Sequence, residues 1–202
     1  MSRPEPSIED QEEFLLSCRY GELEEVTAYT EKYGWASVGG IKDDRGSTVL
    51  HMVCANGHVD ILNLLLPHVP SSLLSQPNSA DTPPLHWAIL NNQVDIVKAL
   101  AEWPEASGGG LPLFKQKNKA GRDAFAQSVW AGEGKEEVSG WIEGYLYRAE
   151  GGEEEDRLDA EAAKAEAEAE VRVESGDEVV KEESEAVEEI VEKTGVLAVK
   201  SE

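Results

Sequence analysis

Apolar residues recur over the first 148 positions in short helical segments that polar turns separate. In four segments an apolar anchor precedes a glycine or asparagine by seven residues: Phe14 to Gly21, Leu50 to Gly57, Leu85 to Asn92 and Phe125 to Gly132. The anchors lie 36, 35 and 40 residues apart, a spacing typical of helix–turn–helix repeats rather than of strands. The pattern predicts an all-α chain of about four stacked helix pairs.

Two of these segments carry a fuller motif. Residues 46–66 read GSTVLHMVCANGHVDILNLLL, and residues 81–100 read DTPPLHWAILNNQVDIVKAL. Both resemble the ankyrin repeat, in which a hairpin, a Thr-Pro-Leu-His helix start and an inter-helix glycine precede a second apolar helix. The resemblance implies an ankyrin-repeat solenoid, because one repeat cannot bury its apolar face alone.

The repeat pattern also fixes the expected boundaries and core. A disordered leader (residues 1–7) should precede four repeats over about 8–40, 41–75, 76–112 and 113–148. Asp81 and Asn92 replace expected glycines, and residues 105–112 read as a flexible insertion. The position four residues after each anchor should be buried: Cys18, Cys54, Ile89 and Val129. The side chains expected to be fully buried are Leu50, Ile61, Leu85 and Ile96.

The composition changes sharply near residue 149. Residues 150–202 hold 20 of the 41 acidic side chains and 6 of the 18 basic ones, and they contain no aromatic residue. Such a segment cannot bury enough apolar surface to offset the entropy lost on ordering. We therefore predict an acidic, largely disordered tail over residues 149–202.

The charge of the chain narrows its possible partners. The formal net charge is −23, which disfavours direct nucleic-acid binding and anionic membranes and favours a basic protein partner. No apolar run is long enough to cross a bilayer, and the N-terminus lacks the pattern of a signal peptide. Two cysteines form no disulfide framework. We expect a monomer in the cytoplasm and nucleus.

One group of residues has the spacing of metal ligands. His51, Cys54 and His58 follow an H-x-x-C-x-x-x-H pattern. However, His51 and His86 share one repeat position, where the imidazole braces neighbouring hairpins, and His58 follows the inter-helix glycine. No nucleophile elbow, phosphate loop or carboxylate pair is present. We therefore predict no metal, no cofactor and no enzymatic activity.

Ankyrin geometry places the binding surface on the hairpin tips and the inner face of each first helix. Trp87 is the main candidate anchor, since large aromatic side chains often dominate interfaces, although it could instead pack on the adjacent repeat. Asp43 has the alternative of capping its own turn. A basic helical segment is expected to place its apolar side on Trp87, Leu90 and Met52 and its lysines near Asp43, Asp44 and Asp81. The same surface is expected to include Arg45, Ser47, Ser79, Thr82, Lys119 and Arg122. The full candidate set is Arg19, Tyr20, Asp43, Asp44, Met52, Asn56, Asp81, Trp87, Leu90, Asn91 and Trp130.

The layout also resembles a narrower family. The chain is similar to fungal ankyrin-repeat chaperones dedicated to ribosomal protein S three of the small subunit. The similarity lies in a Leu-His-Trp-Ala helix, the stretch Gly-x-Gly-Lys-Glu-Glu-Val at 132–138 and an acidic tail. That resemblance implies a holder that keeps a basic ribosomal protein soluble and escorts it during ribosome biogenesis. The alternative is a generic ankyrin-repeat adaptor in signalling or transcription with an unrelated partner.

Overall fold

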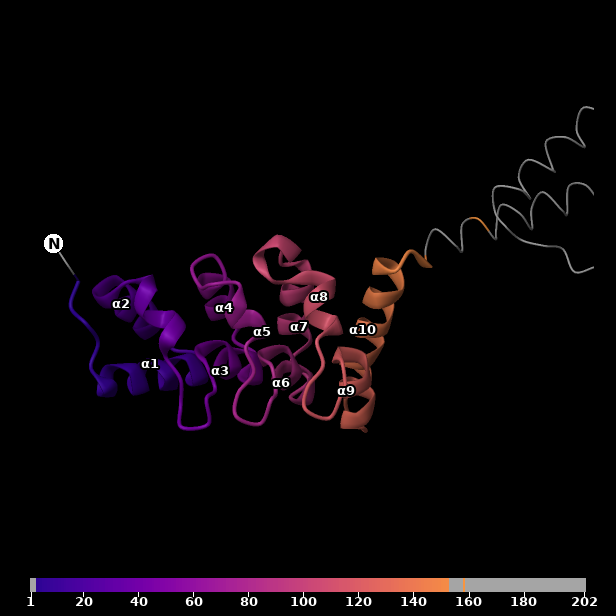
Figure 1. Cartoon of the computed structure of the whole chain (residues 1–202), viewed down its shortest axis with the longest axis horizontal. Coiled ribbons are helices and arrows are strands. Elements are labelled where there is room, and N and C mark those ends of the chain that lie inside the picture. Colours follow the sequence, from indigo (N-terminus) through magenta and orange to yellow (C-terminus); the bar gives the residue numbers. More distant parts are fainter. Residues whose placement is uncertain (1–2, 153–157, 159–202) are drawn as a thin grey trace, which may run out of the picture. The chain divides into compact units, whose positions relative to one another are not determined.

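Helix pairs follow one another along the chain in the computed structural model, which describes residues 3–152 and 158 (Figure 1). The first helices of the pairs are α1 (Ile8–Tyr20), α3 (Val49–Asn56), α6 (Pro84–Leu90) and α9 (Ala124–Ala131). The second helices are α2 (Leu23–Tyr33), α4 (Val59–Leu65), α7 (Val94–Glu102) and α10 (Glu136–Ala149). The connections carry η1 (Trp35–Gly40), α5 (Ser72–Ser75), η2 (Glu105–Ser107) and α8 (Gly110–Lys115).

These elements stack as two layers within one unit, Met1–Gly151. Each first helix contacts the next first helix, and the hairpin loops project from this layer along one edge (Figure 1). The part of the chain that the structure describes contains helices and no strand, as the spacing of the anchors predicts. The predicted tail over 149–202 lies almost entirely outside the described residues.

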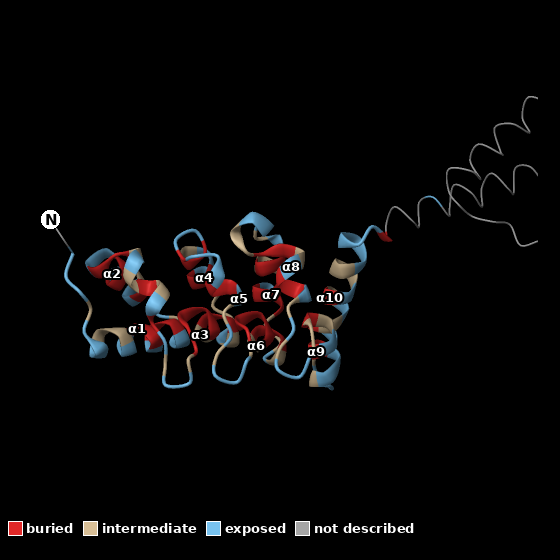
Figure 2. Cartoon of the chain, viewed as in Figure 1, coloured by how far each residue is buried: buried red, intermediate tan, exposed pale blue. Residues whose placement is uncertain are grey.

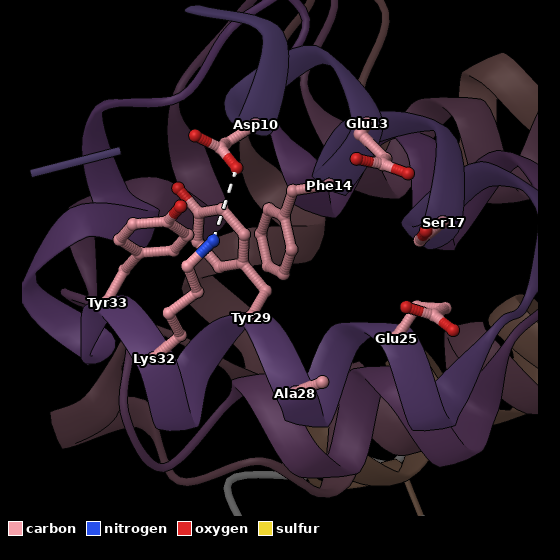
Figure 3. A pocket seen from close by; sticks show the side chains of 9 residues that line it. All are labelled: Asp10, Glu13, Phe14, Ser17, Glu25, Ala28, Tyr29, Lys32 and Tyr33. Atoms are coloured by element: carbon pink, nitrogen blue, oxygen red, sulfur yellow. Dashed lines mark ion pairs between the residues drawn. The ribbon is translucent and has the colours of Figure 1, made fainter. Parts of the chain in front are cut away.

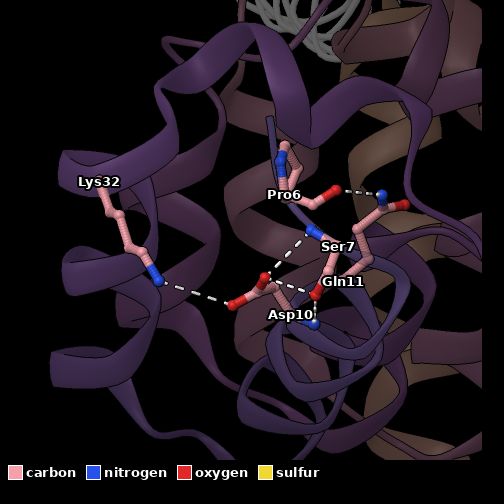
Figure 4. A network of polar contacts seen from close by, with 5 residues as sticks. All are labelled: Pro6, Ser7, Asp10, Gln11 and Lys32. Atoms are coloured by element: carbon pink, nitrogen blue, oxygen red, sulfur yellow. Dashed lines mark hydrogen bonds and ion pairs between the residues drawn. The ribbon is translucent and has the colours of Figure 1, made fainter. Parts of the chain in front are cut away.

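Helix α1 begins at a reciprocal cap. The backbone N–H of Asp10 donates to Ser7 Oγ at 3.1 Å, and the backbone N–H of Ser7 donates to an Asp10 carboxylate oxygen at 3.0 Å (Figure 4). Lys32 of α2 lies 3.6 Å from the same carboxylate. The hydrogen bond from the Ser7 side chain, aided by Tyr33 and Lys32, lowers the pKa of Asp10 to about 2. The cap therefore fixes both the start of α1 and its approach to α2.

The three hairpin tips share one turn. At each tip an Asp or Asn side chain accepts backbone N–H groups two and four residues ahead: Asp43, Asn78 and Asn118. Three residues after each, the backbone is left-handed, with φ of 71° at Gly46, 55° at Asp81 and 73° at Gly121. The aspartate thus keeps the turn geometry that glycine gives in the other hairpins. Asn92 likewise adopts a left-handed φ of 58°.

Two buried histidines join neighbouring repeats. His51 Nδ1 accepts the backbone N–H of Thr48 at 3.0 Å, and its Nε2 meets the carbonyl oxygen of Thr82 in the next hairpin at 3.0 Å. His86 repeats the contact one repeat later, with Nε2 3.2 Å from the carbonyl oxygen of Gln116. The interpretation of these histidines as braces between hairpins is confirmed.

The core runs through the interior of the stack (Figure 2). Leu50, Leu85, Ile61 and Ile96 are fully buried, as the repeat pattern predicts. The fourth repeat departs from it: Val129, expected to be buried like Cys54 and Ile89, is 59% exposed. The expectation was wrong because burial at this position comes from the following repeat, and no further first helix packs against α9 within the described residues.

The insertion before the fourth repeat also differs from its prediction. Residues 105–112, expected to be a flexible loop, contain the 3-10 turn η2 and the first turn of α8. Helix α8 buries Phe114, whose ring lies 4.8 Å from that of Tyr145 and 6.4 Å from that of Trp141. The insertion is therefore partly helical and leads directly into the buried part of α8, Leu113 and Phe114, while Ala106 and Pro112 within it are exposed.

Candidate functional site

A groove of about 680 Å³ opens along the first-helix layer and the hairpin tips. Side chains of α1, α3 and α6 line it together with the first two hairpins. The groove therefore spans three successive repeats, so that any segment lying in it contacts several repeats at once. Its lining residues are Arg19, Asp43, Arg45, Ser47, His51, Met52, Ala55, Asn56, Asn78, Ser79, Ala80, Trp87 and Asn91.

Met52 and Trp87 are the large apolar side chains of the groove. They occupy the same position in successive repeats, two residues after the anchors Leu50 and Leu85. Asn56 and Asn91 stand four residues later, and their amides donate to the carbonyl oxygens of Met52 and Trp87 at 2.8 and 2.9 Å. The second and third repeats thus each place an apolar side chain and a helix-end amide side by side, which suits an amphipathic ligand.

The indole of Trp87 holds an unused donor. Its Nε1 atom is inaccessible to solvent and has no hydrogen-bond partner among the described residues. A buried donor without an acceptor costs about 1–3 kcal/mol. Because the protein itself covers this atom, a ligand in the groove meets the ring carbons of Trp87 and not its N–H.

The charges in the groove are not those of the chain as a whole. Asp43 lines it, but its Oδ1 atom accepts the backbone N–H groups of Arg45 at 3.0 Å and Ser47 at 2.6 Å. The side chains of Arg19 and Arg45 have no partner in the described part of the chain. The predicted alternative in which Asp43 caps its own turn is the one found, and the free charges of the groove are positive.

The eleven predicted site residues divide into two sets. Six of them line the groove: Arg19, Asp43, Met52, Asn56, Trp87 and Asn91. Five lie outside its lining: Tyr20, Asp44, Leu90, Asp81 and Trp130. Trp130 is 62% exposed on α9, where Arg122 lies 3.9 Å from its ring centroid. The two tryptophans therefore occupy different environments, and only Trp87 belongs to the groove.

Some groove-side residues were missed by reasoning from the sequence. His51, Ala55, Asn78 and Ala80 line the groove. Leu16 holds the repeat position of Met52 and Trp87 and is 48% exposed on α1, next to the 65% exposed Tyr20. The spacing from the apolar anchor could have predicted the position of Leu16, since Leu16 follows Phe14 by the same two residues that separate Met52 from Leu50.

The titratable groups near the site are unsuited to nucleophilic chemistry. Burial lowers the pKa of His51 and of His86, so both rings are neutral near pH 7. Burial also raises the pKa of the Cys18 and Cys54 thiols to about 12. His58 contacts the carbonyl oxygen of Arg19 at 2.9 Å. His51 and His58 thus engage backbone groups, and no cluster of metal-binding side chains occurs among the described residues.

A second, smaller pocket of about 150 Å³ lies between α1 and α2 (Figure 3). The stacked rings of Phe14 and Tyr29, 4.1 Å apart, form its wall, and Asp10 and Lys32 pair at its edge. Its polar groups hold the first helix pair together.

No helix in the described part of the chain is long and apolar enough to cross a membrane.

Comparison with known proteins agrees with this architecture. A family model described as ankyrin repeats (3 copies) matches residues 14–107. A chain of the crystal structure of the yeast ribosomal protein Rps3 in complex with its chaperone Yar1 is similar, with 27% identity and a TM-score of 0.59. That match covers 67% of this chain and 92% of the other. A comparison with curated protein sequences gave no match.

Proposed function

Because residues 14–107 form ankyrin repeats, a scaffold typical of protein binding, we propose that this chain is a non-enzymatic chaperone for a basic ribosomal protein of the Rps3 kind. The client would bind in the groove of α1, α3 and α6 and remain soluble until it joins the small ribosomal subunit. The observation that carries the proposal is the similarity to a chain of the Rps3–Yar1 complex, which extends over 92% of that chain.

The charge of the chain supports the same client class. A protein that binds ribosomal RNA is basic, because it must neutralise phosphates, and it aggregates readily with other polyanions before assembly. A holder with a net charge of −23 attracts such a client at long range and occupies part of its basic surface. The acidic segment 149–202 supplies much of this charge. Under this proposal the chain acts as a monomer in the cytoplasm and nucleus, without binding nucleic acid itself.

Binding of yeast Rps3 to the full chain tests the proposal. Calorimetry should give a one-to-one complex, and light scattering should show that Rps3 stays soluble at concentrations where it aggregates alone. Trp87→Ala should weaken binding by more than about 2 kcal/mol, as expected for a central aromatic anchor. Trp130→Ala is the matched control, because that ring lies outside the groove, and should leave affinity unchanged. Absence of any complex with Rps3 would refute the proposal.

The second candidate function is an ankyrin-repeat adaptor with a partner of another class. It is favoured by the breadth of the structural similarity, since 289 solved chains match this fold. The two functions differ in their expected response to salt, because charge-steered association weakens steeply as ionic strength rises. Rps3 binding that is insensitive to salt, or no stronger than binding to a neutral protein of similar size, would favour the adaptor.

A further inference from the structure

The hairpin edge of this strongly acidic chain is not itself acidic. The tips over 41–47, 76–82 and 116–123 contain five basic and four acidic side chains, so their formal net charge is positive. The chain as a whole has more than two acids for each base. The excess of basic side chains lies at the third tip. The two tips that line the groove hold two basic and three acidic side chains, of which only Arg45 and Asp43 line it.

Within the groove the imbalance is carried by two arginines. Arg19 ends α1, and Arg45 lies at the first hairpin tip. Neither guanidinium pairs with a side chain in the described residues. The one carboxylate in the lining, that of Asp43, accepts two backbone N–H groups and is held in its turn. The other titratable lining residue, His51, is kept neutral by its burial, which lowers its pKa more than the contact with the Thr82 carbonyl oxygen raises it.

The same groove has an apolar wall. Met52 and Trp87 provide it, while the Trp87 N–H is covered by the protein itself and takes no part. A ligand that complements the lining must then supply an apolar side chain and a negative charge for the arginines. A lysine-rich segment can supply the apolar side chain but would meet like charge at Arg19 and Arg45.

We propose that the groove recognises a carboxylate-bearing segment of its protein partner, with an Asp or Glu side chain paired to Arg19 and Arg45 and an apolar neighbour on Met52 and Trp87. This reverses the expectation that lysines of the client contact Asp43, Asp44 and Asp81. It rests on the proposed function only in taking the occupant to be a protein segment. A basic client meets this requirement wherever a local acidic, amphipathic stretch is exposed, while the net charge of the two proteins governs their encounter.

Selection of short random peptides displayed on phage, with the full chain as bait, tests the inference without assuming any client. The wild-type chain should enrich peptides in which Asp or Glu accompanies an aromatic or aliphatic residue. The double variant Arg19→Gln/Arg45→Gln should lose the acidic preference but keep the apolar one. Lys98→Gln is the matched control, because this α7 lysine lies outside the groove lining, and should select the same peptides as the wild type.

A selected peptide then gives the size of the effect. Changing its Asp or Glu to the corresponding amide should weaken binding to the wild type about tenfold or more, as for a charge-assisted hydrogen bond. The same change should be silent against the double arginine variant. Thermal melting of each variant shows that the fold is retained.

Three outcomes would overturn the inference. They are enrichment of lysine and arginine, an acidic preference that persists in the double variant, and no peptide retained by the wild type over Trp87→Ala. The proposed function fails separately, through the absence of an Rps3 complex. Acidic peptides that bind through the arginines while Rps3 does not bind would leave the groove chemistry standing and remove the ribosomal client.

Discussion

The contact between the second and third repeats differs from the end of the fourth repeat, although the sequence gives them the same motif positions. His51 contacts Thr82 of the following hairpin, and His86 contacts Gln116 of the next, while the corresponding residue of the fourth repeat is Ala126. Ile89 is fully buried, whereas Val129, its counterpart, is 59% exposed.

The remaining buried side chains of α9 show the reason for the difference. Ala124, Gln127 and Ser128 face α6 or α10 and are buried, while Val129 and Trp130 point away from them and are exposed. Gln127 holds the repeat position of Trp87, but its side-chain oxygen accepts hydrogen bonds from Asn118 at 2.6 Å and Arg122 at 3.1 Å. Whether a repeat position is buried, and what it contacts, therefore depends on the neighbouring repeat. The groove ends before the fourth repeat, where Gln127 replaces the apolar side chain of Met52 and Trp87.

The largest effect on stability is expected from truncating the side chains at the equivalent positions of the third and fourth repeats, Ile89 and Val129. Ile89→Ala should lower the free energy of unfolding by about 2–5 kcal/mol, the usual cost of a cavity in a packed core. Val129→Ala should change it by no more than about 0.5 kcal/mol, because the side chain is largely solvated. Urea denaturation of both variants measures the difference. Equal losses would mean that another segment covers Val129.

A smaller effect is expected from the pH dependence of the histidine contacts. Both folded-state pKa values are lowered by burial, so the unfolded chain binds more protons below its ordinary histidine pKa of about 6.5. The stability they contribute is present above that pH and is lost as the pH falls toward the folded-state values. Chemical denaturation between about pH 7.5 and 5.5 should show a loss of about 1 kcal/mol.

The double variant His51→Gln/His86→Gln isolates this contribution. It should be less stable than the wild type at neutral pH, yet its stability should fall less over the same interval. The Asp10 carboxylate does not interfere, because its pKa of about 2 places its titration far below this window. A variant that follows the wild-type pH profile would show that other groups control it.

The smallest effect is expected at the hairpin tips. Asp81→Gly should stabilise the chain by about 0.5 kcal/mol, because glycine adopts a left-handed φ without the steric cost that aspartate bears there, and its greater freedom in the unfolded chain offsets part of the gain. Gly46→Ala, at the same position of the preceding hairpin, should be destabilising by about 1 kcal/mol. Differential scanning calorimetry of both variants decides the point, and a destabilised Asp81→Gly would imply a contact of the aspartate side chain that compensates for its backbone.

The stacking of the helix pairs could be predicted from the sequence, because the same motif makes the same contacts in successive repeats. The anchors Leu50 and Leu85 and the histidines one residue later sit in equivalent surroundings, so the pattern alone predicts their burial and their partners. The start of α1 at Ile8 depends instead on the Ser7–Asp10 cap, which is local to the first repeat. Terminal repeats lose this advantage, since Phe125 and Val129 have no following first helix in the described chain.

The groove was predicted only in outline. Six of eleven residues line it, because the inner-face positions of α3 and α6 follow directly from the motif. Its charge did not follow, since whether Asp43 is free or held in its own turn depends on backbone geometry that the one-dimensional pattern does not contain. The helical form of residues 110–115 was missed for a related reason: three glycines suggest freedom, while the burial of Phe114 supplies the order.

The hairpins are tied to one another through their backbones, and this separates two kinds of evolutionary change. Ser79 N donates to the carbonyl oxygen of Arg45 at 2.8 Å, and Lys119 N donates to that of Asp81 at 3.2 Å. These bonds use no side-chain atom, so residues at the tips are free to vary without displacing the tips themselves. Recognition can therefore drift from one partner to another by exchange of exposed side chains such as Arg45, while selection on the frame acts elsewhere, on the buried histidines and aliphatic anchors.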